Sequence, residues 1–278
     1  MKIGCFILSD KFKYKKLHEC AINSFSKFHP HVNLYSYDYR YQYLDKLKQL
    51  PVGIARLFIA HSTFKNEKLD KLIILGADTI TCSRLDEFMD DNNYDILTTL
   101  DYPYQLIAQN MFFSKNKKDH VNADVVCYNN IDALKEVIDK SMEIRTEYYE
   151  QAALNFVCNM QEKFTSKIVD GDYENSNVVY NARAKGNIIA ASGEKPWFKY
   201  TNLFEAQDKK LYTSVHENCL KSKQIKLWHY CEGLGTLSET DFEKIINWWI
   251  EKGFNQQTKD FFTNECNCGN FFKEKFTI

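Results

Sequence analysis

Two side chains that could bind a ligand follow apolar segments of this sequence. Asp78 comes soon after the run 72–75, the most apolar strand-like segment of the chain, and His229 lies near the end of another apolar run, 225–230. Carboxylate and imidazole are two of the side chains that hold divalent metals. A carboxylate at the end of a strand can equally well cap a turn, and a lone histidine there is more often structural. The chemistry of both residues therefore depends on what else the sequence brings to the same place.

Three further segments carry polar groups of the kinds that bind hydroxylated or phosphorylated ligands. Arg56 interrupts an apolar helical pattern, and its planar guanidinium suits phosphate oxygens, although a solvent-exposed helix charge is the alternative. The segment 122–124 opens a strand, and the carboxylate of Asp124 readily accepts two hydrogen bonds. Glu150 is followed directly by Gln151, but an ordinary exposed helix position is the commoner role of a lone glutamate.

The elements that must position these residues alternate between strand and helix. Short apolar runs are typical of buried strands, and apolar residues three and four apart are typical of helices. This alternation predicts a doubly wound, mainly parallel α/β sheet with flanking helices, in which ligands bind beyond the carboxyl ends of the strands. The predicted strands are 3–8, 32–37, 72–75, 96–99, 124–128 and 225–230, and the predicted helices are 17–25, 53–64, 131–149 and 239–252.

Charge and composition argue against several classes of protein. Among the 278 residues, 36 Lys and Arg balance 37 Asp and Glu to a formal charge of −1, so we expect no nucleic-acid partner. The longest apolar runs are far shorter than the roughly 20 residues of a transmembrane helix. The N-terminus does not resemble a signal peptide, and the nine scattered cysteines are typical of reduced thiols, so we expect a cytoplasmic protein.

The sequence has no Pro-rich or Ser/Gly-rich linker that would divide it into halves. We therefore expect one main domain over residues 1–237 and a C-terminal helical extension over residues 238–278. The extension contains Trp248 and Trp249 in an amphipathic helical pattern. This helix can pack on the main domain, which is our expectation, or it can form a homodimer or touch a membrane surface.

The sequence around Asp78 is similar to that of a family of enzymes. The segment 72–88, LIILGADTITCSRLDEF, combines an apolar strand, an acid, a hydroxyl residue and a Leu-x-Glu-Phe helix. In this combination the chain resembles the GT-A glycosyltransferases, especially glycosyltransferase family 8, over roughly residues 3–235. The resemblance implies a Rossmann-like GT-A fold and transfer of a hexose from a UDP-sugar to a carbohydrate or glycoconjugate acceptor, with retention of the anomeric configuration. It also implies that Asp78 and His229 hold Mn²⁺ or Mg²⁺.

The resemblance gives the remaining candidates roles in catalysis and in donor binding. Glu150, Gln151 and Asp124 would lie near the anomeric carbon or the sugar hydroxyls. Both acids would act as electrostatic stabilisers, with a covalent nucleophile as the weaker alternative for Glu150. The residues implied in donor binding are Leu8, Ser9, Asp10, Tyr14, Arg56, Ala77, Asn122, Ala123 and Gly233.

The chain departs from the family pattern in ways that keep other functions open. Gly76 stands where the family has the first acid of an Asp-x-Asp motif, Asp124 replaces a glycine, and the phosphate-binding lysine expected after His229 is absent. The alternatives are a sugar-phosphate nucleotidyltransferase and a sugar-nucleotide-binding module without catalysis. A nucleotidyltransferase normally has a glycine-rich phosphate loop after its first strand, and the segment 8–14 contains no glycine.

Overall fold

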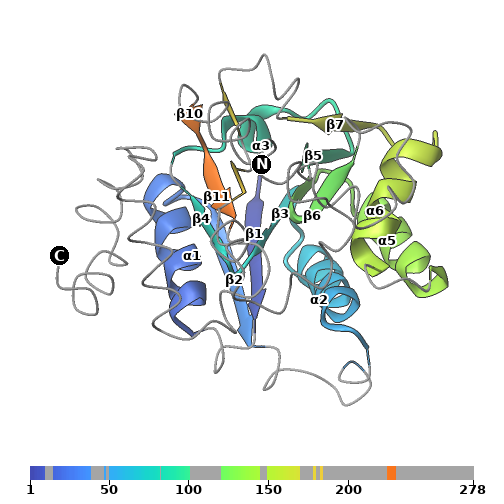
Figure 1. Cartoon of the computed structure of the whole chain (residues 1–278), viewed down its shortest axis with the longest axis horizontal. Coiled ribbons are helices and arrows are strands. Elements are labelled where there is room, and N and C mark those ends of the chain that lie inside the picture. The colour runs from blue at the N-terminus through green and yellow to red at the C-terminus, as the bar shows by residue number, and fades with distance from the viewer. Residues whose placement is uncertain are drawn as a thin grey trace, which may run out of the picture.

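A six-stranded sheet lies at the centre of the protein (Figure 1). The computed structural model describes residues 1–9, 15–38, 47, 50–81, 83–100, 120–144, 149–169, 178–179, 182–183 and 224–229. The strands, in their spatial order, are β2 (Asn33–Asp38), β1 (Ile3–Ser9), β3 (Lys71–Gly76), β6 (Val121–Tyr128), β5 (Ile96–Leu100) and β7 (Ser166–Ile168). The helices are α1 (Lys15–Phe28), α2 (Val52–Asn66), α3 (Asp86–Asp90), α5 (Ile131–Glu143) and α6 (Tyr149–Met160).

All strands of this sheet except β6 run in one direction. β1 pairs parallel with β2 and β3, and β5 pairs parallel with β7, whereas β6 is antiparallel to both of its neighbours, β3 and β5. The predicted α/β sheet, mainly parallel and flanked by helices, is confirmed. The reversal of β6 matters for the site, because it brings the first residues of β6 to the edge of the sheet where β3 and β5 end.

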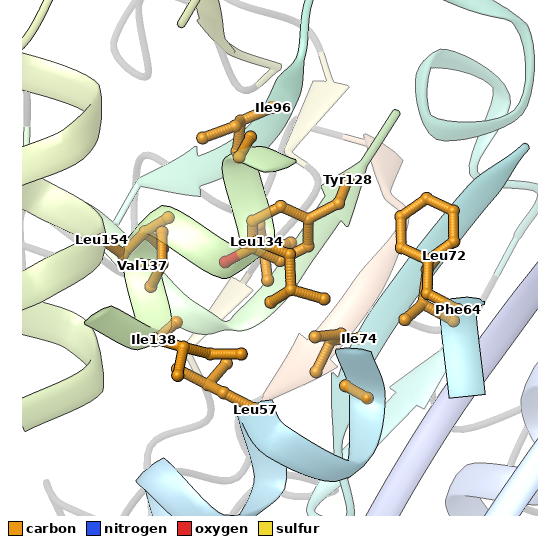
Figure 2. Packing of buried hydrophobic residues seen from close by; sticks show 14 of the residues in the cluster. Leu57, Phe64, Leu72, Ile74, Ile96, Tyr128, Leu134, Val137, Ile138 and Leu154 are labelled. Atoms are coloured by element: carbon orange, nitrogen blue, oxygen red, sulfur yellow. The ribbon is translucent and has the colours of Figure 1, made fainter. Parts of the chain in front are cut away.

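Alternation of side chains along the strands separates two hydrophobic clusters, one on each face of the sheet. On β1, Phe6 and Leu8 belong to the cluster under α2, α5 and α6, whereas Cys5 and Ile7 belong to the cluster under α1 and α3 (Figure 1). Each fully buried side chain of this size contributes roughly 2 kcal/mol to folding. Figure 2 labels members of the first cluster: Leu57, Phe64, Leu72, Ile74, Ile96, Tyr128, Leu134, Val137, Ile138 and Leu154.

In the described part of the chain, five short strands lie outside the main sheet. β4 continues the chain beyond β3 and pairs antiparallel with β11, which pairs parallel with β9. β8 and β10 form a separate parallel pair. Their bounds are β4 (Thr79–Thr81), β8 (Val178–Val179), β9 (Ala182–Arg183), β10 (Gln224–Ile225) and β11 (Leu227–His229).

Some predicted boundaries are wrong. The predicted helix 131–149 ends at Glu143, because the extended backbone of Ile144 (φ −79°, ψ 116°) stops it, and α6 then begins at Tyr149. The predicted strand 225–230 is divided between β10 and β11, and β6 begins at Val121 instead of residue 124. The predicted extension 238–278 lies outside the described residues. Within the described part of the chain, no helix is long and apolar enough to cross a membrane.

A fully buried lysine joins α3 to the sheet. Lys71, the first residue of the central strand β3, has no exposed surface. Its Nζ donates hydrogen bonds to the carbonyl oxygens of Phe88, Met89 and Asp91 at 2.8, 3.1 and 3.0 Å. These three acceptors match the three N–H donors of an ammonium group, so the buried charge is fully hydrogen-bonded while the last carbonyls of a short helix are satisfied.

His29 holds α1 against the segment that precedes α3, and it does so as a neutral imidazole. Its Nε2 accepts a hydrogen bond from the backbone N–H of Leu85 at 2.9 Å, and its Nδ1 donates to the carbonyl of Phe25 at 3.2 Å. Because Nε2 must stay unprotonated to accept, this arrangement excludes the imidazolium form. Burial lowers the pKa of His29 to about 4.

We expect this histidine to make the protein less stable in mild acid. Between pH 6.5 and 4 the unfolded chain binds a proton at His29 and the folded chain does not, so the free energy of unfolding falls as the pH is lowered. From pH 7.5 to pH 5 the loss from this group is about 2 kcal/mol. Urea unfolding at both pH values measures it. His29→Phe, which cannot take up a proton, should lose less stability over this interval, and an equal loss in both proteins would contradict the assignment.

Candidate functional site

The pairing of β6 with β5 is interrupted near the start of β6. Thr98 of β5 pairs with Val126, but the next residue, Thr99, pairs with Asn122. Residues 123–125 therefore bulge out of the ladder. A bulge changes the direction of its side chains and leaves backbone N–H and C=O groups that must find other partners.

Side chains from two helices supply partners for the backbone at the start of β6. At Ala123, Oε1 of Gln151 accepts the N–H at 3.3 Å and Nη2 of Arg56 donates to the carbonyl at 3.2 Å. One turn further along α6, the fully buried Asn155 accepts the N–H of Val121 at 2.8 Å and donates to its carbonyl at 2.9 Å. The start of β6 is thus held by α2 and α6 in addition to its pairing with β5.

Two neighbouring side chains bond two more backbone groups of the bulge. The N–H of Asp124 donates to Oδ1 of Asn122 at 2.9 Å, and Oγ1 of Thr99 donates to the carbonyl of Val125 at 3.3 Å. With these groups bonded, the bulge costs little hydrogen-bond energy. Its backbone is fixed, and so is the position of the carboxylate that Asp124 carries.

A buried guanidinium lies between two carboxylates at this edge of the sheet. Arg56 is only 6% exposed, and its Nη1 forms a hydrogen-bonded ion pair with Oδ1 of Asp124. Its Nη2 lies 4.0 Å from Oε1 of Glu150. The carboxylate side chains are more open, at 36% exposure for Asp124 and 25% for Glu150. The cation therefore lies beneath two acids that solvent or a ligand can reach.

The carboxylate of Glu150 rests on the first turn of α2. A Cβ atom added at Gly53 would overlap this carboxylate, so only glycine leaves room for it. The first turn of a helix favours negative charge. Burial nevertheless raises the pKa of the Glu150 carboxyl, and the positive charge of Arg56 opposes that rise.

Gly76 ends β3 opposite the start of β6. The last antiparallel pair between these strands is Leu75 with Val125, so the register places Gly76 opposite Asp124. A Cβ at Gly76 would lie 2.7 Å from Oδ1 of Asp78, 3.2 Å from Cβ of Asp124 and 3.5 Å from Cγ of Asp124. Asp78 and Asp124 therefore approach each other across the space that a side chain at position 76 would fill.

His229 comes to the same region through β11. In the antiparallel pair of β4 and β11, His229 is the partner of Thr79, the residue that follows Asp78. Thr79 also fixes the turn out of β3, because its Oγ1 donates to the carbonyl of Gly76 at 2.8 Å. The described part includes the backbone of His229 but not its side chain. Among the side chains that are described, no group of three or more His, Cys, Asp or Glu could hold a metal ion.

The end of β1 is organised by a buried histidine. Ser9 is 6% exposed, and its Oγ lies 2.6 Å from Nδ1 of His18. The Nε2 of His18 lies 2.6 Å from Oγ of Ser36 on β2. Since a neutral imidazole donates at one nitrogen and accepts at the other, the two serines must play opposite roles. Leu8, the residue before Ser9, has its side chain in the core.

The structure brings together most of the predicted site residues that it describes. Those at the start of β6 and its supports are Arg56, Asn122, Ala123, Asp124, Glu150 and Gln151, and those at the end of β3 are Ala77 and Asp78. Asp10, Tyr14 and Gly233 lie outside the described residues.

Sequence reasoning gave no role to Gly53, His18 or Asn155. Only Asn155 had a readable signal, since it is four residues after Gln151 and shares its helix face. Gly53 and His18 have no local pattern that would single them out.

Comparison with known proteins shows the fold. No protein-family model and no curated protein sequence matches the chain. A glycosyltransferase involved in the glycosylation of the major capsid of PBCV-1 matches with a TM-score of 0.52 and 12% identity, over 89% of this chain and 100% of that one. The glycosyltransferase GlyE of Streptococcus pneumoniae TIGR4 gives 0.51 and 15%, over 91% of this chain and 64% of that one.

The bifunctional glycosyltransferase WbbM gives a TM-score of 0.50 at 16% identity, over 90% of this chain and 51% of that one. This chain thus spans about half the length of WbbM and less than two thirds of GlyE. The resemblance concerns the three-dimensional arrangement of the chain. This protein has the α/β, GT-A fold of these glycosyltransferases.

We predict that Arg56→Met destabilises the protein by about 2 kcal/mol, since it removes the charged hydrogen bonds to Asp124 and to the carbonyl of Ala123. Urea unfolding measures the change. Lys135→Met is the matched control, because it removes a cation from the exposed pair with Asp139, where we expect little change. Arg56→Lys should recover part of the loss. Equal stability of Arg56→Met and wild type would show that the buried charge does not organise this edge.

Proposed function

We propose that the protein is a glycosyltransferase that transfers a hexose from a UDP-sugar to a carbohydrate or glycoconjugate acceptor, with retention of the anomeric configuration. One observation carries the proposal: in a chain with the GT-A fold, Asp78, Asp124 and Glu150 converge with Arg56 at one edge of the sheet. Ligands of such sheets bind at the carboxyl ends of the strands. β3 and β5 end at this edge, and the reversed β6 begins there.

The donor would lie across the ends of β1 and β3 and the start of β6. We propose contacts of Ser9 and Ala77 with the nucleotide and of Asn122 and Ala123 with the sugar, because these residues belong to those strand ends. Leu8, Asp10, Tyr14 and Gly233 stay predictions from the sequence resemblance.

We propose a divalent cation at the end of β3. Asp78 offers a carboxylate beside the space above Gly76, and the register brings the backbone of His229 next to the same turn. Oxygen and imidazole ligands together suit Mn²⁺, with Mg²⁺ as the second choice. Asp78 and His229 would hold the ion, which when bound offsets the negative charge of a diphosphate.

The chain's own acids would act on the sugar side of the reaction. When the bond between the anomeric carbon and the diphosphate oxygen breaks, positive charge develops on the sugar ring. Carboxylates fixed nearby stabilise that charge. Asp124 and Glu150 are fixed by Arg56 and by the bulge. Their role is electrostatic in this proposal, and Gln151 keeps the bulge in place. A covalent role for Glu150 is the second option.

The sequence resemblance suggested that Arg56 approaches the diphosphate or the sugar. Its contacts favour the sugar side, because the guanidinium already faces two carboxylates and the carbonyl of Ala123. Arg56 would then hold both acids ionised and correctly oriented. The negative charge of the diphosphate would then be offset by the cation and by groups other than Arg56.

The two alternative functions, a sugar-phosphate nucleotidyltransferase and a sugar-nucleotide-binding module without catalysis, differ from a glycosyltransferase in their reaction products. The matched structures with the fold are glycosyltransferases, which does not favour a nucleotidyltransferase. The decisive experiment incubates the protein with a panel of UDP-sugars and Mn²⁺ and measures release of UDP, with and without oligosaccharide acceptors. A glycosyltransferase releases UDP slowly by donor hydrolysis even without an acceptor. A binding module releases none, and a nucleotidyltransferase instead makes pyrophosphate from UTP and a sugar 1-phosphate.

We expect Glu150→Gln to lower kcat for sugar transfer about 100-fold while donor affinity changes little, because the carboxylate acts on charge that exists only in the transition state. Gly53→Ala should also lower kcat, since the added methyl group displaces this carboxylate without removing it. Steady-state kinetics and calorimetric donor binding separate the two effects.

Glu143→Gln is the matched control for this pair, because Glu143 is an exposed glutamate at the end of α5. It should leave both parameters unchanged. Wild-type turnover in Glu150→Gln would remove Glu150 from the reaction.

A further inference from the structure

The glycine at position 76 leaves space between two acidic side chains. Gly76 lies in the regular strand β3, and its φ is outside the left-handed region where glycine is favoured. Other residues could therefore adopt this backbone. A side chain there would instead crowd two acids, since a Cβ at position 76 would lie within 3.5 Å of both Oδ1 of Asp78 and Cγ of Asp124.

The two acids come from different parts of the sheet and are held there independently. Asp78 lies in the turn after β3, which the bond from Thr79 to the carbonyl of Gly76 fixes. Asp124 lies in the bulge of β6, and Arg56 holds one of its oxygens. Two carboxylates held this close repel each other unless positive charge is shared between them.

We propose that Asp124 is a further protein ligand of the divalent cation, beside Asp78, in the space that Gly76 leaves open. The inference rests on the proposed function, which places the cation at Asp78 and His229. A carboxylate offers about four lone pairs, so the bond from Arg56 to Oδ1 does not use up its capacity. Metal-ligating carboxylates commonly accept such a second bond, which orients them. Arg56 is therefore a positioning residue for a metal ligand.

A purely structural role for Asp124 would be to neutralise Arg56. That role explains the ion pair, but residue 76 takes no part in that pair, so it does not account for the glycine. It also does not explain why the acid is more than one-third exposed when its partner is almost fully buried. A ligand position at the mouth of the site accounts for both.

The test measures Mn²⁺ binding and needs no turnover. Electron paramagnetic resonance of free Mn²⁺ is followed while protein is titrated with saturating UDP. Asp78→Asn and Asp124→Asn should each weaken Mn²⁺ binding by about tenfold or more. Gly76→Ala should weaken it comparably without removing a charge. Glu150→Gln is the matched control, because it removes a carboxylate from the same arginine, and we expect less than about a threefold effect.

Asp124→Asn also leaves Arg56 with fewer partners, so thermal unfolding must show that this variant is folded. Gly76→Ala leaves both partners of the ion pair in the sequence and therefore tests the same site independently. Wild-type Mn²⁺ affinity in both variants, with weakened binding in Asp78→Asn, would overturn the role of Asp124 and leave the proposed function intact. An equal loss of Mn²⁺ affinity in Asp124→Asn and Glu150→Gln would mean that only the net charge near the cation matters. That result would also overturn the assignment of Asp124 as a ligand. If wild type binds no Mn²⁺, the inference fails, and UDP release in the presence of a chelator decides separately whether sugar transfer survives.

Discussion

The buried charge of Arg56 constrains this edge of the protein more than any other single group. α2 is apolar around it, with Ala55 and Leu57 fully packed on either side, so the guanidinium cannot reach bulk water. A buried ion without partners costs several kcal/mol. Its partners come from β6 and α6, and Asp124 is 68 residues away in the sequence. Matching one charge therefore brings three distant elements to one place.

Because of the bulge of β6, the groups that pair with Arg56 also form the candidate functional site. A regular strand would pair its backbone with β5 along its whole length. Here Thr99 skips to Asn122, and the released groups are bonded by side chains of α2 and α6. The helices that cover one core thus also position the functional edge of the sheet. Stability and geometry of the site are consequently coupled through the same hydrogen bonds.

The sequence predicts the parts of the fold whose signal is local. Runs such as 72–75 are continuously apolar because a strand buried on both faces has no polar side, and β3 was found for this reason. Arg56 was noticed because it interrupts an apolar helix. The direction of β6 leaves no mark in its apolar pattern, which is the same for either orientation. Lys71 could not be recognised as buried, because lysine is normally exposed and its three carbonyl partners lie 17 to 20 residues later.

The register between β3 and β6 connects two positions at which the sequence departs from the family pattern, residues 76 and 124. In the family that the sequence resembles, an acid stands at position 76 and a glycine at position 124. Read along the chain, Gly76 and Asp124 are two unrelated departures from the family pattern, 48 positions apart (124 minus 76). Across the sheet they face each other, and a Cβ at position 76 would lie only 3.2 Å from Cβ of Asp124. The two changes amount to one exchange of partners, and in relatives of this chain the two positions should covary, with an acid at one accompanied by a small residue at the other.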